Sequence, residues 1–285
     1  MDMSARAFHT TRRFFIAALC ASSAVFTPTA ATAQGDLLIA PTRVILDGRR
    51  GEQIVLSNIG DKEATYRIGL ELRRMNPDGS LSDVEPEQAN DKEKAALEMV
   101  RYAPRRVTLP PSQPQSIRVN ARPGADLPDG EYRVHMSFNA IPDAKPVTPQ
   151  SAQPASASGG ISIELIPIYG ITIPLIVRKG RVEAMASIDS PKLRQTAKGP
   201  ELAIHLSRSG EASTYGELRV KAPGKSDPVF LARGIAIYPE LDGRSLKFSL
   251  TPEQAAAMRG PLTFEYREMP EAGGGLIASL QASLP

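Results

Sequence analysis

The sequence predicts an all-β protein built from two β-sandwiches. Short runs in which apolar and polar residues alternate recur along most of the chain. Turn sequences rich in Gly, Pro, Asn and Asp separate these runs, as at residues 76–79 and 127–130. Patterns with the 3.6-residue period of a helix are scarce, so strands at this spacing indicate sandwiches.

The chain begins with a segment typical of a secretory signal peptide. Residues 1–33 have a basic start, an apolar middle and a small-residue end, with a cleavage site expected before Gln34. Arg12 and Arg13 also fit the twin-arginine export pattern, so Sec and Tat export both stay open. The only Cys, Cys20, leaves with this segment, and the mature protein is held without disulfides.

Removal of residues 1–33 from the 285-residue chain leaves 252 residues, enough for two sandwiches. We expect a helix of two or three turns within 85–100 and a short turn-rich segment at 251–260. Strands are expected over residues 36–47, 52–59, 65–75, 106–110, 115–122, 130–141, 161–178, 182–189, 201–209, 215–222, 228–240, 245–251, 262–268 and 276–283.

A domain boundary is predicted at residues 178–181. About seven strands lie on each side of it, which is the content of an immunoglobulin-like domain. The predicted organisation is a signal peptide at 1–33, a first sandwich at 34–178 and a second at 179–285. The joint "RKGR" is short, so we expect a fixed rather than a floppy connection.

The most hydrophobic stretch, residues 161–178, follows a segment at 143–160 that is rich in Pro, Ala and Ser. Two interpretations stay open from this pattern alone. The stretch is either a fully buried central strand behind an inert loop, or a strand that offers apolar side chains and backbone groups to a partner.

The sequence carries no recognisable catalytic constellation. The mature chain has two histidines, His135 and His205, both within predicted strands and without metal-ligand spacing, and it has no Cys. No phosphate-binding loop or nucleophile elbow follows a strand, and Trp is absent. We therefore expect no enzyme activity, small-molecule substrate, cofactor or metal. The net charge of +3 falls to +1 without residues 1–33, which argues against nucleic-acid binding.

Five segments, in the same order, resemble the periplasmic pilus chaperones of the PapD-like family. They are "APTRVILDG" from Ala40, "IVLSNIGDKEATYRI" from Ile54, "APRRVTLPPSQPQSIRV" from Ala103, "DLPDGEYRVHMSFNAIP" from Asp126 and "IPLIVR" from Ile173. The resemblance covers roughly residues 40–180 and is weaker in the second half, as in a divergent member.

The resemblance implies two immunoglobulin-like sandwiches in an L or boomerang arrangement. It also implies a periplasmic chaperone that holds pilin subunits by lending them a strand and delivers them to an outer-membrane usher. On this basis Ile161, Ile163 and Leu165 form the donor row, which Ile166 and Ile168 continue if Pro167 shifts the register.

The resemblance further implies an anchor for the carboxylate at the C-terminus of the subunit. Arg43 matches the family's Arg, but Pro174 occupies the position of its Lys. Glu131 and Arg178 match two members of a charge network that joins the two domains. The third member falls in residues 255–258, which contain no acid. The alternative function is a structural or surface-adhesion sandwich protein without a pilin client.

Overall fold

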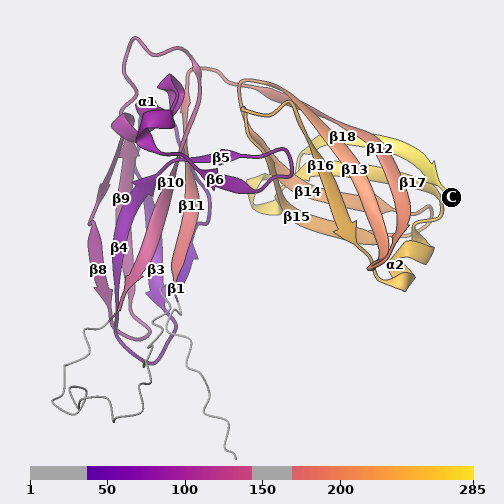
Figure 1. Cartoon of the computed structure of the whole chain (residues 1–285), viewed down its shortest axis with the longest axis horizontal. Helices are drawn as coiled ribbons and strands as arrows, with labels where there is room; N and C mark the ends of the chain where they lie inside the picture. The colour runs from indigo at the N-terminus through magenta and orange to yellow at the C-terminus, as the bar shows by residue number, and fades with distance from the viewer. Residues whose placement is uncertain (1–36, 143–168) are drawn as a thin grey trace, which may run out of the picture. The chain divides into compact units, whose positions relative to one another are not determined.

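The computed structural model describes residues 37–142 and 169–285 (Figure 1). The predicted signal peptide and the predicted donor residues Ile161, Ile163, Leu165, Ile166 and Ile168 lie outside the described residues. The described chain consists mainly of strands, which confirms the all-β prediction (Figure 1).

The first sandwich pairs two sheets that differ in their number of strands. One sheet has the order β1 (Leu37–Ala40), β3 (Glu52–Asn58), β9 (Pro114–Ala121) and β7 (Val100–Ala103). The other has the order β2 (Val44–Leu46), β11 (Gly170–Lys179), β10 (Gly130–Ile141), β4 (Ala64–Glu71) and β8 (Arg106–Leu109). A separate hairpin joins β5 (Arg73–Met75) to β6 (Leu81–Asp83).

The run predicted as one strand at 36–47 is divided between the two sheets. β1 pairs with β3, whereas β2 pairs in parallel with β11. Pro41 lies between them, and a proline lacks the N–H group needed to continue a ladder. The chain therefore crosses from one sheet to the other at residues 41–43, which places Arg43 directly before β2.

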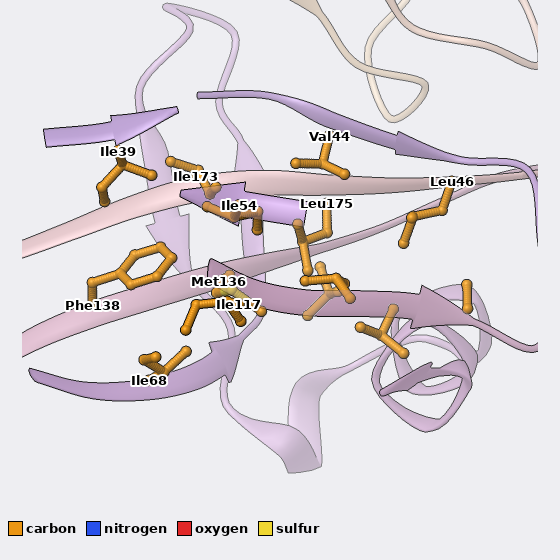
Figure 2. Packing of buried hydrophobic residues seen from close by; sticks show 14 of the residues in the cluster. Ile39, Val44, Leu46, Ile54, Ile68, Ile117, Met136, Phe138, Ile173 and Leu175 are labelled. Carbon is orange, nitrogen blue, oxygen red and sulfur yellow. The ribbon is translucent and has the colours of Figure 1, made fainter. Parts of the chain in front are cut away.

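Alternation along each strand builds the core of the first sandwich. On β10, the side chains of Tyr132, Val134, Met136 and Phe138 point inward and are buried. Figure 2 shows side chains from both sheets meeting in this core, among them Ile54, Phe138 and Ile173. The opposite face of β10 carries polar residues that remain available for the site described below.

The predicted helix within 85–100 is present but shorter than that range. α1 spans Asp91–Met99 after a 3-10 turn at Pro86–Gln88. Asn90 caps it, because its side chain accepts from the backbone N–H of Glu93 while the Glu93 carboxylate accepts from the N–H of Asn90. Residues 100–103 leave the helix to form β7, where β-branched Val100 is buried.

The second sandwich has its own core. One sheet has the order β12 (Ala184–Thr196), β13 (Gly199–Gly210) and β16 (Gly243–Ser249). The other has the order β15 (Phe230–Ile237), β14 (Thr214–Lys221), β17 (Gly260–Glu268) and β18 (Leu276–Leu284). β12 extends beyond the predicted 182–189 through a register shift between Asp189 and Lys192. α2 (Pro252–Ala257) occupies the predicted turn-rich segment, and a 3-10 turn (Pro270–Ala272) follows β17.

Candidate functional site

Arg43 lies against residues of the second sandwich. Its Nη2 donates to Ser213 Oγ at 2.8 Å, and its Nη1 lies 3.5 Å from the hydroxyl of Tyr238. Its guanidinium carbon lies 4.5 Å from the ring centroid of Tyr215 and 5.6 Å from that of Tyr238. These contacts hold a half-buried cation in place with groups that carry no negative charge.

Glu131 and Arg178 form an ion pair because their strands place them opposite each other. The register of β10 and β11 aligns these two residues, and Arg178 Nε lies 3.2 Å from Glu131 Oε2. The same carboxylate oxygen accepts from the backbone N–H and the hydroxyl of Ser213, each at 3.0 Å. Glu131 is buried, and these donors replace water at Oε2, whereas Oε1 has no hydrogen-bond partner among the described residues.

The third member of the charge network of Glu131 and Arg178 does not lie at residues 255–258, where the resemblance places it. Residues 255–258 include the end of α2, and Met258 is buried in the core of the second sandwich. Ser213 instead supplies the contact to Glu131 from the second sandwich. The absence of an acid in residues 255–258 was predicted, but no sequence motif indicates that the uncharged Ser213 contacts Glu131.

Ser213 joins the two arginines into one hydrogen-bonded network. Its hydroxyl accepts from Arg43 and donates to Glu131, which in turn accepts from Arg178. The network contains two guanidinium groups and one carboxylate, so its formal charge is positive by one. Arg43 and Arg178 both line a pocket of about 450 Å³, together with Ser213 and Tyr215. The pocket therefore presents positive charge next to an aromatic wall.

A second polar contact lies beside this network. Arg133 binds both carboxylate oxygens of Glu240 and also donates to the backbone carbonyl of Arg73 at 3.0 Å. Its guanidinium carbon lies 3.6 Å from the ring centroid of Tyr238. Burial favours the neutral form of Glu240, but Arg133 and the N–H of Met75 outweigh it and hold the pKa of Glu240 below its usual 4.5.

Pro174, at the position expected for an anchoring Lys, pairs in register with His135. His135 is buried, and neither of its ring nitrogens has a hydrogen-bond partner among the described residues. Burial, followed by the charges of Arg133, Arg73 and Arg43, lowers the pKa of His135 to about 3. His135 is thus neutral at physiological pH and cannot replace the missing cation.

One edge of β11 is open over half of its length. The strand pairs with β10 from Gly170 to Lys179, but on its other side β2 covers only Leu175–Val177. Within the described chain, Gly170–Pro174 have no strand partner on that side. Ile173 is buried, whereas Ile171, in the same row, is 37% exposed and Tyr169 is 47% exposed. The apolar row therefore runs past the end of the core.

The described residues lack two kinds of feature. They contain no group of three or more His, Cys, Asp or Glu side chains that could hold a metal ion. No helix among them is both long enough and apolar enough to cross a membrane.

The chain is similar to several solved chaperone structures. The YadV chaperone matches at 14% identity with a TM-score of 0.45, over 88% of this chain and 100% of the other. The E. coli chaperone DraB matches at 15% identity with a TM-score of 0.44, over 87% of this chain and 96% of the other. A chain in the complex of the Salmonella enterica SafA pilin with the SafB chaperone matches at 18% and 0.44, over 89% and 99%. No protein-family model and no curated protein matches the sequence.

Proposed function

We propose that this protein is a periplasmic chaperone for pilus subunits. It holds a subunit by adding a strand to the subunit's incomplete sheet, and it passes the subunit to an outer-membrane usher. The sequence resemblance supplies the class of client and the usher. The observation that carries the proposal is the edge of β11 at Gly170–Pro174, which has no strand partner within residues 37–142 and 169–285 and lies beside the exposed apolar side chains of Tyr169 and Ile171.

Strand addition uses two properties of such an edge. The free N–H and C=O groups of an edge strand bind a partner backbone, and alternate side chains enter a groove of the partner. β11 offers both at Gly170–Pro174. The residues before Tyr169 continue the apolar sequence, and Ile161, Ile163 and Leu165 are proposed to extend the row into the subunit. A subunit that lacks a strand is thereby kept from aggregating.

Arg43 is proposed to bind the carboxylate at the end of the subunit. Its guanidinium lines the pocket and carries a hydrogen bond to an uncharged serine. Within the described chain, no carboxylate forms an ion pair with it. A carboxylate ligand would supply the missing counter-charge through charge-assisted hydrogen bonds.

The test compares two apolar residues with equal exposure. Ile171 and Val55 are both 37% exposed, but Ile171 lies on the open row and Val55 lies on β3. Each is replaced by Asn in a chaperone co-expressed with a candidate β-sandwich pilus subunit. When the subunit covers this position, Ile171→Asn forgoes the burial of the exposed part of the Ile side chain, worth roughly 1 kcal/mol of binding free energy. The variant also buries a polar amide, which costs about 1–3 kcal/mol. Binding should therefore weaken by ten-fold or more, whereas Val55→Asn should bind normally.

Both variants should keep the unfolding midpoint of the free chaperone, because neither side chain is in the core. Equal subunit binding by Ile171→Asn and wild type would refute strand addition at this edge. A chaperone that leaves the subunit unprotected in every form would favour the structural or surface-adhesion alternative.

A further inference from the structure

We infer that Arg178, and not a lysine on β11, is the second cation that binds the terminal carboxylate of a client. This inference rests on the proposed function and assigns a ligand to the pocket beside Arg43. Arg178 is placed on β11 four residues beyond Pro174, and its side chain lines the same pocket of about 450 Å³. The two arginines therefore line one pocket that is large enough for a ligand.

Arg178 has N–H donors that make no hydrogen bond to the described residues. Its ion pair with Glu131 uses only Nε, at 3.2 Å. Among the described residues, no hydrogen bond or ion pair engages its two terminal nitrogens, and the side chain is about one third exposed. These nitrogens form the end of the planar fork that matches a carboxylate geometrically. Arg178 can thus bind a ligand without giving up Glu131.

The charge balance of the network points to a ligand with one negative charge. Arg43 and Arg178 share the single carboxylate of Glu131 through Ser213, which leaves one positive charge uncompensated. A second acid would have neutralised the network, but the contact from the second sandwich comes from the uncharged Ser213. Because Glu131 is the one acid that pairs with these arginines among the described residues, the terminal nitrogens of Arg178 can bind a ligand carboxylate.

Two further acids line the pocket and restrict where an anion can sit. Glu268 and Glu271 belong to the end of β17 and the turn after it, and both are exposed. Exposed charges are screened by salt more strongly than the half-buried arginines. The pocket is thus lined by two half-buried arginines and two exposed acids, and an anion is stabilised beside the arginines. This arrangement favours a single carboxylate at the arginine end over a multiply charged anion.

The experiment uses the mature full-length chain and a small mimic of a chain end. N-acetyl-L-phenylalanine carries the terminal carboxylate, and its carboxamide is the uncharged control. Binding of both is followed by NMR titration, and the readout is the ratio of the two affinities. Wild type should prefer the acid. Arg178→Gln should reduce that preference by about ten-fold, and Arg178→Lys should retain most of it.

Glu131→Gln separates ligand binding from a structural role, because it breaks the same ion pair from the other side. Binding by Arg178 predicts that this variant raises the acid preference, since the network charge rises from one to two. A purely structural role predicts equal losses in Arg178→Gln and Glu131→Gln, and that result would overturn the inference. Unfolding midpoints measured in parallel show whether each variant is folded.

Two other results also overturn the inference. Each of them can be told apart from a failure of the proposed chaperone function. If Arg43→Ala removes the acid preference while Arg178→Gln does not, Arg43 acts alone and the chaperone function stands. If wild type shows no acid preference, the pocket is not the carboxylate site. The proposed function would then stand or fall by the Ile171→Asn comparison.

Discussion

Glu240 offers a test of how burial changes the value of an ion pair. Glu240→Gln removes the charge that faces Arg133 and keeps the shape of the side chain. The Arg133 side chain is 9% exposed and that of Glu240 is 25% exposed. The control is Glu183→Gln, in an ion pair with Arg181 at 2.8 Å whose side chains are 72% and 91% exposed.

The expected magnitude follows from what Arg133 retains. Truncating one partner of a buried ion pair costs about 3–5 kcal/mol. In the variant, Arg133 still donates to the backbone carbonyl of Arg73 and stacks on Tyr238, and the amide oxygen can still accept from it. We therefore expect the free energy of unfolding to fall by about 2–3 kcal/mol, the value of a charge-assisted hydrogen bond. The exposed control should cost less than about 1 kcal/mol.

The effect of Glu240→Gln should also depend on pH, with a definite sign. The pKa of Glu240 is lower in the folded protein than its usual 4.5, so the unfolded chain binds this proton first as the pH falls. The stabilisation is complete above pH 4.5 and is lost as the pH falls through the depressed pKa. The difference between wild type and variant should accordingly be largest near neutral pH and shrink in acid.

Urea denaturation of both variants from pH 7 to pH 3 measures these differences. Equal costs for Glu240→Gln and Glu183→Gln at pH 7 would refute the argument from burial. A cost for Glu240→Gln that stays constant down to pH 3 would refute the argument from its pKa.

Two other residues give predictions of similar kind. The pKa of His135 is lowered to about 3, so the unfolded chain takes up this proton first as the pH falls, and the free energy of unfolding of wild type should fall by about 2 kcal/mol between pH 7 and pH 5. His135→Leu should lack this loss in urea denaturation. An equal dependence of the free energy of unfolding on pH in both proteins would contradict the lowered pKa of His135. Phe138→Ala should lower the free energy of unfolding by about 3–5 kcal/mol, because the ring is fully buried; the exposed Leu38→Ala should stay within about 0.5 kcal/mol, and similar losses would contradict the core assignment.

Alternation and turn chemistry predicted most of the strands, whereas β6 (Leu81–Asp83) and β7 (Val100–Ala103) were not predicted. Along β10, the even-numbered residues from Tyr132 to Phe138 enter the core, and the odd-numbered ones lie on the opposite face, where Glu131, His135 and Ser137 are also buried. The same alternation places Glu131 and Arg178 on one face of adjacent strands. The errors occurred where a local pattern does not reveal the partner of a strand. The run 36–47 was predicted as one strand, yet its two halves pair in different sheets.

Residue patterning predicted the all-β class, and the resemblance to known segments identified Arg43, Glu131 and Arg178. The groups that contact these residues were found in the folded protein alone, because Ser213 and Tyr238 lie 170 and 195 residues from Arg43. A serine hydroxyl and a tyrosine ring have no local signature of such contacts. Strand identity follows from neighbouring residues, whereas the charge balance of a pocket depends on which distant residues the packing brings together.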